Sequence, residues 1–206
     1  MLSYLQVGLY AFLFATSIII AIGPQNIFII KQSIYQKKPY LAAFICASCD
    51  FSLITLGVYI LSSHINDSLL SMLKWIGILF LIIYAITNIK EAINPKKNVK
   101  IESNKEEKKS FSAKNTIRLS FAFSLLNPHV YIDTVLILGS LGAKHEGYER
   151  LFFIIGASFA SYLWFFLNAY IGTKMIYIFS KPAISRSFDI LVSLIMLAMA
   201  YTIYKL

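Results

Sequence analysis

Long runs of apolar residues alternate with polar connections along most of this chain. Hydrophobic residues make up 58% of its 206 residues and charged residues 14%, whereas a typical soluble domain carries about 25% charged residues. A helix needs about 20 apolar residues to cross the hydrocarbon core of a bilayer, and the runs approach or exceed this length. The pattern predicts an all-α polytopic membrane protein with transmembrane helices near residues 4–31, 40–62, 69–89, 116–141, 150–173 and 186–204.

Residues 90–115 form the only long connection, and they are rich in lysine and glutamate and poor in apolar residues. Such a composition cannot bury a core of its own. The connection divides a single membrane domain, residues 1–206, into residues 1–89 and residues 116–206, each with three apolar segments. After three crossings the second half enters the membrane from the opposite face, so the pattern predicts two inverted three-helix repeats.

The first segment of each half is interrupted by a proline with polar neighbours. Gly23 and Pro24 precede Gln25 and Asn26 in the first half, and Asn127, Pro128 and His129 follow one another in the second. Proline suits the first position of a helix, and asparagine is a good N-cap. We therefore expect broken first and fourth helices whose second pieces present unpaired N–H groups, which favour anions. The alternative is that the prolines kink these helices for packing alone.

Most lysines and arginines fall in the first, third and fifth connections, and few in the others. Connections rich in these residues remain on the cytoplasmic side of a membrane. The sequence thus predicts that the basic connections are cytoplasmic and that both termini lie outside. A re-entrant first segment would instead place the N-terminus inside. The net charge of +9 is explained by topology and by anionic lipid, without nucleic acid as a partner.

Two aspartates, Asp50 and Asp133, lie within apolar segments. A carboxylate at membrane depth costs roughly 2.5–3.5 kcal/mol, and such residues often mark a transport path. Burial disfavours a charged carboxylate, and a nearby cation favours it. A cationic solute would therefore displace a proton from such a pair, which is the chemistry of proton antiport. The alternatives are that these carboxyl groups are hydrated, protonated or capped by Asn and Ser side chains.

Acidic side chains opposite two helix N-termini would suit a solute with a cationic side chain and a carboxylate, which describes a basic amino acid. Asn168 and Trp164, in the fifth segment, are candidates to line the same cavity. Asn168 has an alternative role in bonding a neighbouring helix. Asp189 lies near the start of the sixth segment, where a carboxylate favours a helix N-terminus, and we expect it to cap that helix.

Cys46 and Cys49 form a C-x-x-C pattern next to Asp50. In a soluble protein this spacing indicates redox or metal chemistry, but small residues in membrane helices also favour close packing. A metal site needs further ligands, and His129 is the only histidine within an apolar segment. The favoured interpretation is packing, so no metal or cofactor is predicted. The redox and metal interpretations stay open as alternatives.

Several of these motifs together resemble the lysine/arginine exporter (LysE/ArgO) family of the LysE superfamily. The resemblance is carried by Gly23-Pro24-Gln25-Asn26, Cys49-Asp50, the run from Asn127 to Thr134 that includes Asp133, and residues Ala157 to Phe166. It implies a bacterial inner-membrane exporter of arginine, lysine and their toxic analogues, driven by proton antiport. It also implies that Asp50 and Asp133 are the functional aspartates.

The predicted protein is thus a secondary transporter and not an enzyme, with a basic amino acid, protons and the lipid bilayer as its partners. A thin six-helix bundle is also compatible with a homodimer. Export of a neutral amino acid or a heavy-metal cation is the alternative within the same class. A membrane thiol–disulfide electron conductor that uses Cys46 and Cys49 is the alternative from a different class.

Overall fold

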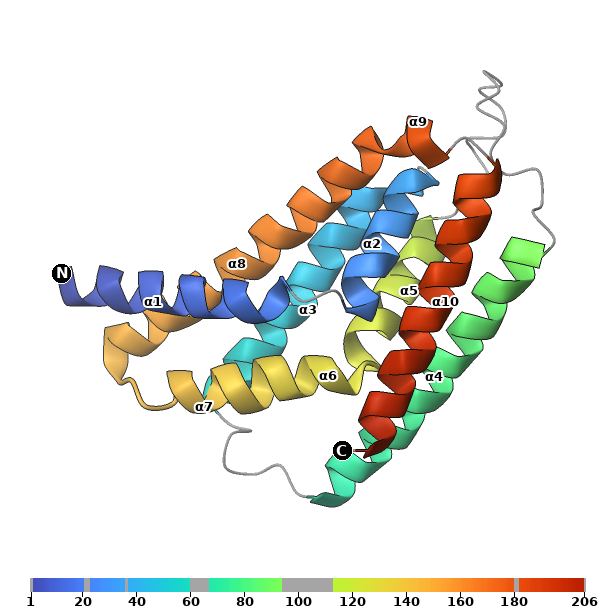
Figure 1. Cartoon of the computed structure of the whole chain (residues 1–206). Helices are drawn as coiled ribbons and strands as arrows, with labels where there is room; N and C mark the ends of the chain where they lie inside the picture. Colours follow the sequence, from blue (N-terminus) through green and yellow to red (C-terminus); the bar gives the residue numbers. More distant parts are fainter. Residues whose placement is uncertain are drawn as a thin grey trace.

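In a computed structural model of the chain, the described residues are helical apart from short turns and helix ends (Figure 1). The structure describes residues 2–20, 23–35, 37–59, 67–93, 113–179 and 182–205. Residues 94–112, which make up most of the connection predicted over residues 90–115, lie outside the described residues.

The first half of the chain begins with a broken helix. Its elements are α1 (Leu2–Ile19), α2 (Pro24–Ile34), α3 (Pro39–Tyr59) and α4 (Asp67–Ile93). The axes of α1 and α2 differ by 77°. Gly23 precedes α2 with extended backbone, and Pro24 is the first helical residue. The helix break predicted at Gly23-Pro24 is therefore present.

The second half also begins with a broken helix. Its elements are α5 (Ala113–Leu125), α6 (Pro128–Val130), η3 (Tyr131–Leu138), α7 (Gly139–Gly142), α8 (Gly147–Lys174), α9 (Ile176–Phe179) and α10 (Pro182–Lys205). The break predicted at Asn127-Pro128 lies between α5 and α6. From Pro128 onward, α6, η3 and α7 run on continuously, and η3 is π-helical. Single π-helical turns inside helices are frequent at functional sites.

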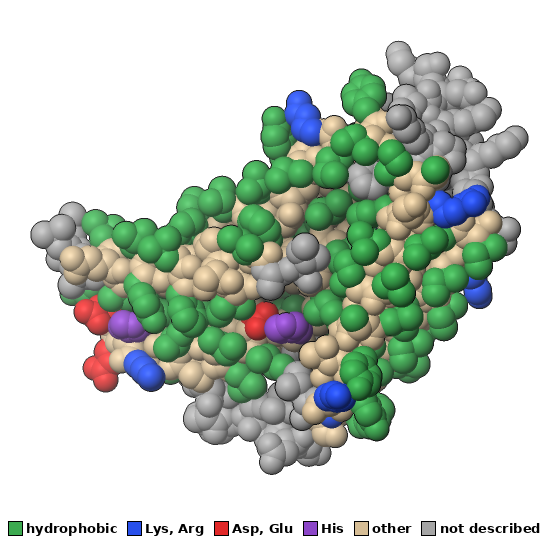
Figure 2. Space-filling model, in the orientation of Figure 1, with side chains coloured by type: hydrophobic (Ala, Val, Ile, Leu, Met, Phe, Trp, Pro, Cys, Tyr) green, Lys and Arg blue, Asp and Glu red, His purple; other side chains and the backbone are tan. Residues whose placement is uncertain are grey.

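Three helices of the described chain are long and apolar enough to span a membrane, namely α3, α8 and α10, and the bent pair α1–α2 makes a fourth. The 27 residues of α4 also exceed the length needed, since they extend about 40 Å. Large apolar side chains are exposed on all of the long helices, and Figure 2 shows them covering most of the visible face. A surface of this kind is typical of a protein in contact with lipid.

The helices pack in two groups that differ in their neighbours. α8 packs along α1, α2 and α3, whereas α4 and α10 pack mainly against each other as an antiparallel pair (Figure 1). At the crossing of α1 and α8, a Cβ atom on Gly156 would overlap the backbone oxygen of Gly8. Glycine at this crossing thus allows the two backbones to touch, as small residues commonly do between membrane helices.

The structure corrects the expected role of Asp189. The helix α10 begins at Pro182, and no acidic residue lies in its first turn. Asp189 is instead buried beside Lys31, with 2.9 Å between the ammonium nitrogen and the carboxylate. Lys31 is the last residue of the predicted segment 4–31 and is counted with the basic residues of the connection after it, but α2 continues to Ile34 and the lysine side chain is buried.

Candidate functional site

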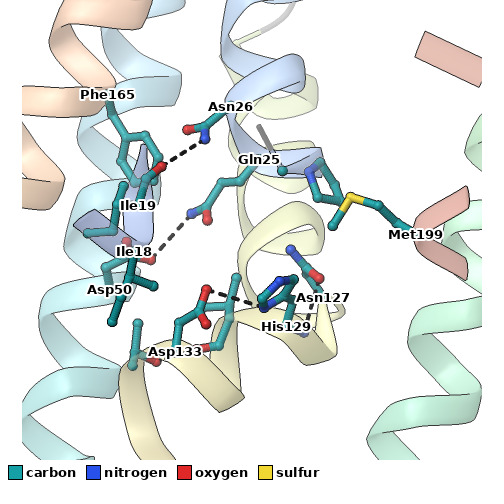
Figure 3. Close-up of a pocket in the computed structure, with 14 residues that line it drawn as sticks. Ile18, Ile19, Gln25, Asn26, Asp50, Asn127, His129, Asp133, Phe165 and Met199 are labelled. Atoms are coloured by element: carbon teal, nitrogen blue, oxygen red, sulfur yellow. Dashed lines mark hydrogen bonds and ion pairs between the residues drawn. The ribbon is translucent and has the colours of Figure 1, made fainter. Parts of the chain in front are cut away.

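A cavity lined by both polar and apolar side chains lies where the two helix breaks meet α3. The cavity volume that the centres of water molecules can occupy is about 70 Å³, which is enough for several waters. Figure 3 shows the side chains that surround it. The lining residues are Ile18, Ile19, Gly23, Pro24, Gln25, Asn26, Asp50, Asn127, His129, Val130, Asp133, Thr134, Phe165 and Met199. Both aspartates that the sequence singled out therefore face one cavity.

Asp50 is the buried acid of this site. It lies on α3, and 3% of its surface is exposed. The amide Nε2 of Gln25 lies 3.4 Å from Oδ1 of Asp50 and 3.0 Å from Oγ of Ser124. Gln25 thus connects the first turn of α2 to α3 and to the last turn of α5, and it directs an N–H group at a carboxylate that is shielded from solvent.

Asp133 is the more exposed acid. It lies on η3, and its Oδ2 is 3.3 Å from Nδ1 of His129, one helical turn earlier. Nearly half of the His129 side chain is exposed, against about a quarter of the Asp133 side chain. Figure 3 shows these two side chains pointing toward each other at the cavity. The imidazole of His129 is therefore the polar partner of Asp133 at the cavity.

The start of α6 is capped as the sequence predicted. The side-chain oxygen Oδ1 of Asn127 accepts a hydrogen bond from the backbone N–H of His129 at 3.2 Å. This bond satisfies one of the N–H groups that a helix start leaves unpaired. Asn127 itself is buried, so its side chain is held between the helix end and the cavity.

Asn26 bridges the break between α1 and α2. Its Nδ2 donates to the backbone oxygen of Ile19 at 3.1 Å, and its Oδ1 accepts from Nδ2 of Asn168 at 3.4 Å. A freed carbonyl at membrane depth needs such a partner, because no bulk water is present. Asn168 therefore supports the break from α8 through Asn26 and is not itself among the cavity-lining residues.

The sequence-predicted site residues divide into three groups. Gly23, Pro24, Gln25, Asn26, Asn127, His129 and both aspartates line the cavity. Asn168 and Trp164 do not line the cavity; Trp164 packs beside the apolar cluster around Phe28 and Phe165. Pro128 is the first residue of α6, and its side chain is outside the described part of the chain.

Sequence reasoning missed several residues of the site. Ser124, which accepts the bond from Gln25, lies one turn before the Asn127-Pro128 break, and that spacing is a signal that could have identified it. Phe165 and Met199 line the cavity from α8 and α10. Apolar residues in apolar segments carry no comparable signal.

Cys46 and Cys49 are both buried as free thiols. Cys46 belongs to the apolar cluster that contains Phe28, Ala43 and Phe123. Within the described residues, no group of three His, Cys, Asp or Glu side chains could hold a metal ion. The surroundings of Cys46 are those of a small residue in a packed helix interface.

A helical membrane protein with a cavity that contains two acidic side chains between two broken helices has the features of a secondary transporter. Comparison with known proteins gives the family. Residues 16–205 match the family described as LysE type translocator. The chain belongs to this family, and it is a multi-pass transporter rather than an enzyme.

The chain is similar to curated proteins along nearly its whole length. It is 33% identical to the arginine exporter protein ArgO of Pectobacterium carotovorum subsp. carotovorum over 190 residues, which cover 91% of each chain. It is 32% identical to the putative amino-acid transporter YggA of Aeromonas salmonicida, with 93% of this chain and 92% of that one covered. For the arginine exporter protein ArgO of Enterobacter sp. (strain 638) the identity is 32%, with 100% and 95% covered. No solved structure matches the chain.

Proposed function

We propose that this protein exports basic amino acids, arginine and lysine together with their toxic analogues, from the bacterial cytoplasm in exchange for protons. The observation that carries the proposal is the placement of Asp50 and Asp133 in one cavity at two helix breaks. Relatives named as arginine exporters and as an amino-acid transporter support the substrate class.

The cavity offers complementary groups to the two ends of such a substrate. Asp50 and Asp133 would hold the guanidinium or ammonium group, which exchanges with a proton because burial favours the protonated carboxyl group and a nearby cation favours the charged one. The first turn of α2, with the polar side chains of Gln25 and Asn26, would hold the α-carboxylate, because a helix start favours anions. Asn127, Pro128 and His129 form the corresponding start in the second half.

The packing supports two inverted three-helix repeats within six membrane spans. Each half contains a broken helix followed by two long helices. The middle helices, α3 and α8, pack against each other, and so do the last helices, α4 and α10. In addition, α2 of the first half packs on α8 of the second, and η3 of the second half packs on α3 of the first. An approximate two-fold relation between the halves would generate each of these pairings.

The proposed location is the bacterial inner membrane, with the basic connections in the cytoplasm and both termini outside. Reporter enzymes that are active on only one side of the membrane, fused to each end, test this orientation. An N-terminal reporter active in the cytoplasm would favour a re-entrant first segment and contradict the six-span arrangement.

Transport is tested with the purified chain in proteoliposomes. A gradient of arginine or lysine should drive proton movement in the opposite direction, recorded with a pH-sensitive dye inside the vesicles. Gradients of threonine and of cadmium are tested in the same way, because they represent the alternative substrate classes. Proton movement driven by either of these solutes but not by arginine or lysine would overturn the substrate assignment.

A further inference from the structure

Lys31 and Asp189 form a buried ion pair that the cavity chemistry does not use. Their charged atoms are 2.9 Å apart, and the two side chains are 8% and 5% exposed. Neither residue lines the cavity. A buried ion pair is weak support for stability, because desolvation offsets the attraction, and its best-attested role is to fix a register or a switch.

The surroundings of the pair join three helices. Nζ of Lys31, on α2, also donates to Oδ1 of Asn88 on α4, and it lies 5.7 and 5.9 Å from the ring centroids of Tyr35 and Tyr84. The hydroxyl of Tyr35 lies 3.3 Å from Oδ2 of Asp189 on α10. Both charges are therefore held by specific polar and aromatic partners from α2, α4 and α10.

The α4–α10 pair is a distinct unit on the side of the molecule. Its helices pack mainly against each other, and their buried residues form a cluster with Ile27 of α2. A further contact is made by the rings of Phe80 and Tyr84, which meet Phe123 of α5. These contacts are apolar, whereas directional bonds from α2 to the unit come from Lys31 and Tyr35, which bond to Asn88, Ser185 and Asp189.

The ion pair lies to one side of the cavity. Lys31 follows the cavity residue Asn26 by five residues, or about 8 Å along the helix, and Asp189 precedes Met199 by ten residues, or about 15 Å. Figure 1 shows α2 running from the break toward α9 and the first turns of α10, away from α6. His129, which is half exposed, is on α6. The pair thus lies between the level of the cavity along α2 and the end of that helix at Ile34.

We propose that Lys31 and Asp189 are a gate between α2 and the α4–α10 unit, which closes this end of the cavity and must separate once in each transport cycle. The inference rests on the proposed export function. When α10 moves off α2, both charged groups become hydrated, and the cavity opens toward the end that carries the basic connections. Re-formation of the pair returns the arrangement described above.

A reversible cross-link tests the gate. Lys31→Cys and Asp189→Cys are combined in a chain that also carries Cys46→Ala and Cys49→Ala, and the two thiols are linked with a bis-methanethiosulfonate reagent. The reduced protein in proteoliposomes is expected to export arginine. Complete linking should lower the export rate at least tenfold, and a reducing agent should restore it.

The matched control links α4 to α10 without α2. Trp75 and Tyr204 are both exposed, and their ring centroids are 6.0 Å apart. The same reagent applied to Trp75→Cys with Tyr204→Cys should leave export unchanged, because the two helices move together. Unchanged export after complete linking of positions 31 and 189, or equal inhibition by both links, would overturn the gate. The unmodified chain is measured in parallel, and its failure to export arginine would count against the export function rather than against the gate.

A charge exchange provides a second test if the cysteine variant does not reach the membrane. Lys31→Asp and Asp189→Lys each place two like charges in a buried site, and each should reduce export strongly. The combined exchange restores opposite charges and should recover at least a tenfold higher export rate than either single variant. Recovery of membrane content without recovery of export would assign the pair a structural role only.

Discussion

Nε2 of Gln25 lies 3.4 Å from Oδ1 of Asp50, so the first turn of α2 is bonded to the buried acid of α3. The same nitrogen reaches Ser124 at the end of α5. One amide therefore ties together the pieces that meet at the two helix breaks. A substrate that binds Asp50, as proposed above, would meet the amide of Gln25 at the same carboxylate.

Replacement of either aspartate by asparagine should abolish arginine export. Asp50→Asn keeps an oxygen for the bond from Gln25 but removes the negative charge that a guanidinium group requires. Export is measured as resistance of cells to a toxic arginine analogue, and membrane content by immunoblot. We expect a loss of at least 100-fold in export rate, equivalent to about 3 kcal/mol, with normal content of Asp50→Asn and of Asp133→Asn.

The control for these variants is Glu149→Gln. Glu149 lies at the start of α8, pairs with His145 and is about two-fifths exposed, away from the cavity. Exposed pairs contribute little to stability, so resistance should be unchanged. If cells with either aspartate variant remained resistant to the analogue, the assignment of these acids to the substrate would be wrong.

Gln25→Ala should weaken substrate binding and leave the fold intact. The variant removes the donor to Asp50 and Ser124, and a buried group that loses its partner costs roughly 1–3 kcal/mol. We expect the arginine concentration at half-maximal export to rise about tenfold. Gln32→Ala is the matched control on α2. Its side chain is also buried, but its Oε1 has no partner among the described residues. A similar effect of both substitutions would indicate a general disturbance of α2.

The sequence was sufficient to locate the helix breaks and the acids of the cavity. Gly23-Pro24 and Asn127-Pro128 interrupt helices for local reasons, namely the fixed φ of proline and the capping ability of asparagine. Asp50 and Asp133 were identified because a carboxylate within an apolar segment is costly. These signals are local, and the structure adds that both acids face the same cavity.

The sequence was not sufficient to identify contacts between distant helices. Lys31 and Asp189 are 158 positions apart, and no local pattern indicates that they pair. Lys31 ends the predicted segment 4–31 and is counted with the connection after it, because a lysine at the end of an apolar run normally marks a connection. The contribution of Met199 to the cavity was equally hidden, since it depends on how α10 packs beside α2.

Gly156→Ala should destabilise the protein far more than Gly8→Ala, although both glycines lie at the crossing of α1 and α8. A Cβ atom on Gly156 would overlap the backbone of Gly8, whereas one on Gly8 would lie 3.2 Å from the backbone oxygen of Phe152. Overpacking of this kind typically costs about 1–3 kcal/mol. Thermal unfolding in detergent measures the difference, and equal melting temperatures for the two variants would contradict this helix crossing.

Cys46→Ala combined with Cys49→Ala should retain export, because both thiols are buried and Cys46 packs in an apolar cluster. Alanine preserves a small apolar side chain at each position, and the loss of the sulfur atoms leaves only small cavities. Export of arginine from proteoliposomes should stay within about twofold of the unmodified protein, a difference of about 0.4 kcal/mol, since neither cysteine lines the cavity. A thiol–disulfide electron conductor would lose all activity, because the sulfur atoms would carry its electrons. If this variant had normal membrane content but lost arginine-driven proton movement, the result would therefore indicate that the cysteine pair takes part in transport.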